Sequence, residues 1–426
     1  MTSDTQEKKP IPHARWNYWI HTLEGCFNVA GLAFIQVELV LPALFRSLDA
    51  PNIMIALSPI LIMAGLMAPP LFTAHLVERL DYYKPVMNFF TVLHRIPYFI
   101  IAATLFYFGT SHPEAVLYIT FLGLILIGAS FGVVVVGWME WASKTVEGNR
   151  LSSMMATRNI VGAIMGVFAG GAIKKILDST ESPQGYGILF LITGIFGVIS
   201  FSIFIWVKEE RTVKPKQLEE DQNRSSLMQT LKTAPTLFSK HPRMRKLLWS
   251  RLAYSGVFIV TPFMGIHAID TTGQGDGFLG VLVTWQMVGS IIGNLFAGYW
   301  GDKLGPKTPS LVSCIAFLLF FAGMYFNTSV IGFQILFAFF GFAFYTNMAS
   351  RLSLDLEVCG PERRPIFMSV MTFLTLISML SASTLAALLR DLGSSSLKPA
   401  IILGTLLMTL SVFFLARIKN PRFAKS

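Results

Sequence analysis

The sequence predicts an all-α membrane protein whose twelve transmembrane helices form two pseudo-symmetric six-helix bundles. Of its 426 residues, 53% are hydrophobic and only 14% are charged, whereas charged residues make up about a quarter of a soluble chain. Apolar stretches of roughly 20 residues, long enough to cross the ~30 Å hydrocarbon layer, recur along the whole length. A charged turn between two such stretches also occurs twice, once in each half of the chain.

The apolar stretches place the twelve spans and the segments that separate them. The spans lie near residues 18–44, 52–76, 86–109, 115–140, 154–177, 186–207, 247–269, 278–300, 309–327, 331–353, 366–389 and 398–417. They predict an N-terminal tail (1–17), a first half (18–207), a central linker (208–246), a second half (247–417) and a C-terminal tail (418–426). The polar linker is expected in solvent, with a short surface helix around residues 227–238 as an option. No small-residue cleavage site follows the first span, so it should remain as an anchor.

The distribution of lysine and arginine between alternate loops predicts the orientation. If the N-terminus is inside, the tails, the linker and the inner loops hold most of these residues. The outer loops keep only Arg46, Lys174, Lys175, Arg390 and Lys398. We therefore expect a protein of the cytoplasmic (inner) membrane with both termini in the cytoplasm. The net charge is +10, but the basic residues are spread over the tails and alternate loops and do not form one patch. Nucleic acid is therefore not an expected partner.

The charged turn is clearest at residues 298–307, which read Gly-Tyr-Trp-Gly-Asp-Lys-Leu-Gly-Pro-Lys. Each charge would be expensive to insert into lipid, so this turn belongs at a membrane edge. It resembles the turn between the second and third helices of the major facilitator superfamily, Gly-x-x-x-Asp-Arg/Lys-x-Gly-Arg/Lys-Arg/Lys. The matching positions are Gly298, Asp302, Lys303, Gly305 and Lys307. A fainter copy at residues 74–84 keeps the acid, the following base and the final lysine.

This resemblance implies a transporter with its substrate path between the two halves, lined by the first, fourth, seventh and tenth helices. In the family, the acid of the turn meets the start of a helix from the other half and holds the inner gate shut. Carried over, Asp302 and Lys303 should face residues 152–153 at the start of the fifth span. Glu78 and Arg79 should face the start of the eleventh. The alternative is that these charges only fix the topology.

Polar residues form a stripe along the first span at helical spacing. The stripe consists of Glu24, Asn28, Gly31, Ile35 and Glu38. Two carboxylates and an amide on one stripe cannot face lipid, because an intramembrane charge needs protein partners or water. The stripe therefore predicts a polar cavity wall, with Glu38 or Glu24 as a proton carrier. The alternative is a structural ion pair within the first half.

Two arginines within spans are further candidates. Arg95, beside His94 in the third span, is the natural partner of the acids in the first span, because arginine stays charged and must be neutralised. It forms either a structural salt bridge or a substrate- or proton-linked site. Arg251, early in the seventh span, could bind an anionic substrate, close the inner mouth of the path or extend its charge to the interface.

The tenth and fourth spans add candidates of two kinds. Tyr345 and Asn347 are expected to line the cavity. Arg351 and Asp355, one turn apart, predict an ion pair at the inner edge. Glu140, which stands between two tryptophans at the inner end of the fourth span, is a candidate gate acid. The alternative for Glu140 is a solvated carboxylate within an interfacial aromatic belt.

Glycines recur in the fifth span at Gly162, Gly166, Gly170 and Gly171. The pattern resembles that of the superfamily's antiporters, with Val167 where those carry a proline. Small residues at every fourth position also let two helices approach closely. Both interpretations stay open, but the missing proline weakens the first.

These features predict a secondary active transporter that moves a small solute by alternating access, coupled to protons. No Gly-x-x-x-x-Gly-Lys-Ser/Thr loop is present, so direct nucleotide drive is not indicated. No metal-ligand or His/Asp cluster has suitable spacing, so neither an enzyme nor a cofactor is expected. The alternative is a lipid translocator or a non-transporting receptor on the same scaffold. The expected partners are the unidentified substrate, protons and the bilayer, and the expected state is a monomer.

Overall fold

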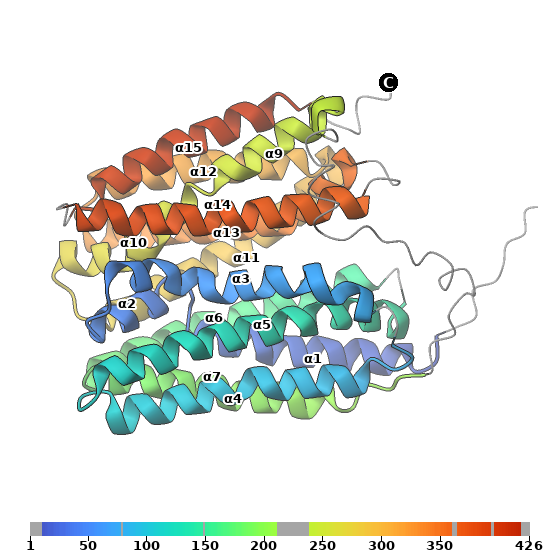
Figure 1. The fold of residues 1–426 in the computed structure, drawn as a ribbon, viewed down its shortest axis with the longest axis horizontal. Helices are drawn as coiled ribbons and strands as arrows, with labels where there is room; N and C mark the ends of the chain where they lie inside the picture. The colour runs from blue at the N-terminus through green and yellow to red at the C-terminus, as the bar shows by residue number, and fades with distance from the viewer. Residues whose placement is uncertain are drawn as a thin grey trace, which may run out of the picture.

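The computed structural model describes residues 11–77, 80–147, 150–210, 238–359, 364–392 and 396–418. The helices of these segments run alongside one another in two groups, α1 to α7 below and α9 to α15 above (Figure 1). The helix α1 begins, and α15 ends, at the same end of the molecule. We call this the terminal end, and the opposite one, where α2 and α10 end, the distal end.

Each group supplies six membrane spans. The first group contains α1 (Ala14–Ala33), α2 (Val40–Ser47), α3 (Asn52–Val77), α4 (Lys84–Phe108), α5 (Pro113–Thr145), α6 (Leu151–Ser179) and α7 (Gln184–Phe204). The second contains α9 (Pro242–Tyr254), α10 (Val257–Thr272), α11 (Phe278–Leu304), α12 (Lys307–Phe326), α13 (Val330–Val358), α14 (Arg364–Asp391) and α15 (Lys398–Ala416). Among the described residues, 11 spans are long and apolar enough to cross a membrane. The remaining span is the first, which is divided between α1 and α2, so the predicted fold class is confirmed.

The two halves meet along α6 and α11 and along α3 and α14. The closest approach involves glycine. A Cβ atom on Gly280 of α11 would lie 2.3 Å from the Lys174 backbone nitrogen and 2.4 Å from the Gly170 carbonyl oxygen of α6. Gly166 faces Met287 of α11 in the same way, whereas Gly162 faces α1. Gly162, Gly166 and Gly170 therefore serve close helix packing on two neighbours, whereas a Cβ atom on Gly171 would meet nothing within 4 Å.

The first and seventh spans, which occupy corresponding positions in the two halves, are both interrupted. Between α1 and α2 the chain leaves the helix at residues 34–39, and between α9 and α10 it does so at residues 255–256. The first break crosses the seventh span closely, because Leu39 packs over Gly265 of α10. Interrupted spans in matching positions mark the substrate region of many transporters.

The prediction of one continuous helix over residues 18–44 is wrong, and so is the stripe that joined Glu38 to Glu24. The helix ends at Ala33, so Glu38 lies beyond the break. Pro42 gives the physical reason, since it has no N–H to bond the Glu38 carbonyl and its ring crowds that carbonyl. Hydropathy does not register this effect, because the residues around the break are mostly apolar.

Helices also begin earlier than the apolar stretches do. The first starts at Ala14 and the seventh span at Pro242, several residues before the predicted 18 and 247. The added turn of α9 carries basic residues that extend past the apolar stretch, which hydropathy cannot recognise as helical. Most of the predicted linker, and all but the last residue of its optional surface helix, lies outside the described residues.

Candidate functional site

The break in the first span holds a buried carboxylate. Glu38 is 8% exposed, and its Oε2 accepts a hydrogen bond of 2.8 Å from the Gln36 side-chain nitrogen. The backbone N–H groups of Leu39 and Val40 bond the Gln36 carbonyl, at 3.0 and 2.8 Å, and so fix the turn that presents the carboxylate. Within the part of the chain that the structure describes, no lysine, arginine or histidine lies within ion-pairing distance of Glu38.

Two side chains of the second half approach the same carboxylate. The Gln286 amide of α11 lies against the Glu38 carboxylate, and the Tyr345 phenol of α13 lies close to both Glu38 and Gln36. Gln286 is fully buried, yet neither atom of its amide has a hydrogen-bond partner of ordinary geometry. We call Gln36, Glu38, Gln286 and Tyr345 the interface site, because they lie between the two halves.

Sequence reasoning named two members of the interface site, Glu38 and Tyr345, and missed Gln36 and Gln286. Gln36 lies off the polar stripe of the first span, and Gln286 lies in the eighth span, which is not among those expected to line the path. A glutamine inside an apolar span was the available signal, because its amide must find partners away from water. Asn28 of α1, another predicted cavity residue, is half-buried.

Glu24 belongs to a separate cluster inside the first half. Its Oε2 lies 3.5 Å from a guanidinium nitrogen of Arg158 on α6, and its Oε1 accepts a hydrogen bond of 3.0 Å from Ser200. The Arg158 guanidinium stacks over the Trp138 ring at 4.4 Å. Arg158 was not among the predicted residues, although a charge in the fifth span could have indicated it.

Arg95 lies on the other side of Ser200. Its guanidinium donates to the carbonyls of Gly197 and Thr91, at 2.5 and 2.8 Å, and to the Ser200 hydroxyl at 3.0 Å. It therefore reaches Glu24 only through Ser200, and the direct pairing expected with an acid of the first span is wrong. Backbone carbonyls neutralise Arg95 instead, and this geometry supports a structural role.

The second half holds a buried ion pair between α9 and α13. Arg251 donates from Nη2 to Asp355 at 2.8 Å and to the Arg351 carbonyl at 3.0 Å. The predicted pair of Arg351 with Asp355 is thus replaced, because Arg251 reaches the carboxylate from a facing helix. Asn347, Arg251 and Ser250 line a water-sized cavity of about 10 Å³ beside the pair. This cavity lies within one half and not between the two.

The predicted gate residues are only partly described. Asp302 and Lys303 are exposed at the terminal end of α11, and the Lys303 ammonium lies over the rings of Tyr299 and Trp300 on its own helix. Glu78 and Arg79 lie outside the described residues. Contact of either turn with the opposite half stays a prediction.

Glu140 is exposed at the end of α5, near the terminal end of the molecule. The tryptophans beside it do not form an interfacial belt. Trp138 and Trp141 are buried in the bundle, and both pack edge-on against His21. The Trp138 indole also donates to the His21 ring at 3.2 Å.

Three side-chain contacts join the halves at the distal end, where α2 and α10 lie side by side (Figure 1). In each, a donor of the first half bonds a carboxylate of the second. The pairs are Arg46 with Asp270 at 2.7 Å, Asn52 with Asp391 at 2.7 Å, and Tyr186 with Asp276 at 2.8 Å. We call them the distal seal. They tie the two halves together at the distal end.

Reversing one charge of the distal seal should loosen it. Arg46→Asp places two acids together at an exposed pair, so we expect a change of roughly 1 kcal/mol, about fivefold, in favour of an open distal end. Spin labels at Ser47 and Thr272 would report the separation of α2 and α10. Arg46→Asp combined with Asp270→Arg should restore the wild-type distance.

The matched control is Lys175→Asp, which makes the same charge change at an exposed distal position. It should leave the label distance unchanged. An equal response to both single variants would mean that net charge, and not the ion pair, sets the separation.

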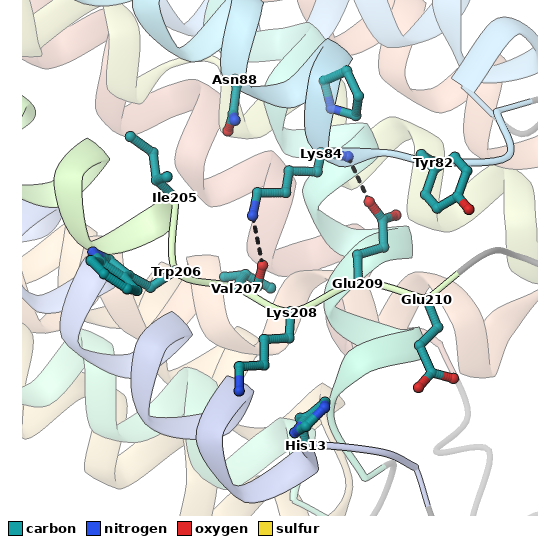
Figure 2. A pocket seen from close by; sticks show the side chains of 11 residues that line it. His13, Tyr82, Lys84, Asn88, Ile205, Trp206, Val207, Lys208, Glu209 and Glu210 are labelled. Carbon is teal, nitrogen blue, oxygen red and sulfur yellow. Dashed lines mark hydrogen bonds between the residues drawn. The ribbon is translucent and has the colours of Figure 1, made fainter.

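A pocket of about 670 Å³ opens at the terminal end, within the first half. Figure 2 shows the segment after α7 passing the start of α4. The Glu209 carboxylate accepts hydrogen bonds from the backbone N–H groups of Tyr83 and Lys84, at 2.7 and 2.9 Å. The Lys84 ammonium bonds the Val207 carbonyl at 3.0 Å. Because its lining comes from one half, this pocket is not part of the interface site.

Comparison with known proteins agrees with this architecture. A model of the Major Facilitator Superfamily matches residues 248–426. Among curated proteins, none matches. The fold, with its buried polar site between two six-span halves, is that of a multi-pass membrane protein. The family match lies in the second half of the chain, which resembles this superfamily in sequence.

Solved structures show the same fold over nearly the whole chain. The D-xylose-proton symporter has 12% identity and a TM-score of 0.69, covering 96% of this chain and 99% of that one. The nucleoside transporter NupG has 13% identity and a TM-score of 0.63, covering 94% and 98%. A bacterial homologue of the human lysosomal transporter Spinster, inward-facing and occupied, has 13% identity and a TM-score of 0.59, covering 96% and 95%.

Proposed function

We propose that this protein is a secondary active transporter that moves a small solute by alternating access and couples the movement to protons through Glu38. The observation that carries the proposal is a buried carboxylate, between the halves, with no cationic partner among the described residues. An ionised carboxylate is costly to bury unpaired. Glu38 would therefore carry a proton when the site is closed and release it when the site opens to water.

The contacts between the halves support alternating access. The distal seal closes one side, and the two interrupted spans cross beside the interface site. By the distribution of lysine and arginine, the terminal end would face the cytoplasm of a cell whose inner membrane holds the protein. Opening toward the other side would then require the distal seal to break. Two of the structural neighbours, the D-xylose-proton symporter and the nucleoside transporter NupG, agree with a small solute.

Glu38→Gln should abolish coupling without abolishing folding. In vesicles loaded with a pH-sensitive dye, the wild-type protein should move protons when a substrate from a panel of metabolites is added. The variant should show no substrate-dependent proton movement, because the amide neither binds nor releases a proton. It should still exchange labelled substrate across the membrane.

Glu114→Gln, at an exposed acid beginning α5, is the matched control and should behave as wild type. Proton movement that survives Glu38→Gln would refute the assignment of this residue as the proton carrier. A wild-type protein that moves no solute, but scrambles labelled phospholipid, would favour the lipid translocator.

A further inference from the structure

The interface site contains an amide whose hydrogen-bonding capacity is unused. Gln286 is fully buried, and both its Nε2 and its Oε1 lack a hydrogen bond of ordinary geometry. Leaving a buried polar group unsatisfied costs roughly 1–3 kcal/mol, and native proteins keep such groups few. The amide lies against Glu38 without a hydrogen bond of ordinary geometry at either end, which indicates a further partner from outside the chain.

The backbone of Gln286 is firmly placed. A Cβ atom on Gly341 of α13 would lie 2.0 Å from the Gln286 carbonyl oxygen, so the two helices touch at this level. The Gln286 side chain lies close to Glu38. Tyr345, one turn after Gly341 on α13, also lies close to Glu38. Packing holds the amide beside the proposed proton carrier.

The charges at the interface site argue against an anionic solute. The site offers two amides, one phenol and one carboxylate, and no cation pairs with Glu38 among the described residues. Two arginines within the spans are paired with other acids. Arg158 pairs with Glu24, and Arg251 pairs with Asp355. An anionic solute would lie beside Glu38 with no cation to balance its charge.

The hydrogen-bonding pattern also separates a neutral solute from an amine. An ammonium group only donates, so it could satisfy the Gln286 carbonyl but not the amide N–H groups. A hydroxyl donates and accepts, and a hydroxyl-rich solute can satisfy both ends of one amide. The Tyr345 phenol can also donate and accept, whereas the Gln36 amide already donates to Glu38.

We infer that the interface site binds a neutral, polyhydroxylated solute, with Gln286 as its principal hydrogen-bonding residue. This inference rests on the proposed transport function, because it assigns the substrate class of the same site. Protonated Glu38 then adds a donor and an acceptor without adding a charge. Solute and proton would occupy the site together.

Binding to purified protein tests the inference without any gradient. The probes are D-xylose, D-glucitol and uridine for the neutral class, propylammonium and choline for organic cations with and without N–H donors, and citrate for anions. Saturable binding of at least one neutral probe is expected, by calorimetry. Gln286→Leu should weaken that binding at least tenfold. Gln334→Leu, a half-buried glutamine elsewhere on α13, is the matched control and should bind as wild type.

A second measurement separates binding from structure. Gln286→Leu removes a buried amide that the described chain does not satisfy, so the Tm of the ligand-free variant should equal or exceed that of wild type. A lower Tm would mean that Gln286 serves folding, and would overturn the inference. Binding of propylammonium, choline or citrate in place of the neutral probes would also overturn it, as would binding by none. Neutral binding combined with uncoupled transport would leave the inference standing and refute the proton role of Glu38.

Discussion

Replacing Arg158 by leucine should destabilise the protein by about 3–5 kcal/mol, because it leaves the Glu24 carboxylate buried without a cation. The pair lies 3.5 Å apart, with both side chains about one-tenth exposed. Arg158 also covers the Trp138 ring, so the variant loses packing as well as charge. Reversible unfolding of the purified protein in mixed detergent micelles would measure the change.

Removing the acid as well should restore much of the loss. The double variant Glu24→Gln with Arg158→Leu has no unpaired charge, so its free energy of unfolding should lie closer to wild type than that of Arg158→Leu. Arg150→Leu is the matched control at the start of the same helix, since its pair with Glu147 is half-exposed. That variant should lose at most about 1 kcal/mol. Similar losses for Arg150→Leu and Arg158→Leu would show that burial does not set the strength of the inner pair.

Gly280→Leu should drive the two halves apart at the distal end. The added side chain would meet the backbone of α6 at 2.3–2.4 Å, and backbone cannot move aside as a flexible side chain can. Overpacking of this kind costs roughly 1–3 kcal/mol, which corresponds to about a 5- to 150-fold change in a two-state population. Spin-label distances across α6 and α11 should lengthen, and transport should slow because the distal side no longer closes.

Gly171→Leu provides the control for this second variant. Gly171 is next to Gly170, yet a Cβ there would meet nothing within 4 Å. The label distances and the transport rate should stay at their wild-type values. Unchanged distances in Gly280→Leu would contradict the view that this crossing holds the distal end shut.

Hydropathy and the repeated turn were sufficient for the fold class, because span length and charge placement are local properties of the sequence. The partners inside the bundle were less accessible. Glu24 and Arg158 meet across 134 positions of sequence, and helical periodicity tells which face a residue occupies but not which helix lies opposite. For the same reason, the sequence did not show that Asp355 pairs with Arg251 of a facing helix and not with Arg351.

The interface site shows a second limit. Its two acidic or aromatic members were found because such residues are conspicuous in a membrane span. Its two glutamines carry no charge, and their importance depends on burial between halves that meet only in three dimensions. The break that presents Glu38 depends on one proline, whose effect falls four residues earlier in the chain.

The distal seal also carries information about how the two halves have diverged. In a pair of identical halves related by a two-fold axis, each half would carry both members of every contact. Here the first half supplies Arg46, Asn52 and Tyr186 as donors, and the second supplies all three carboxylates. Neither half could form these contacts with a copy of itself. The seal therefore requires two different halves, one that supplies the donors and one that supplies the carboxylates.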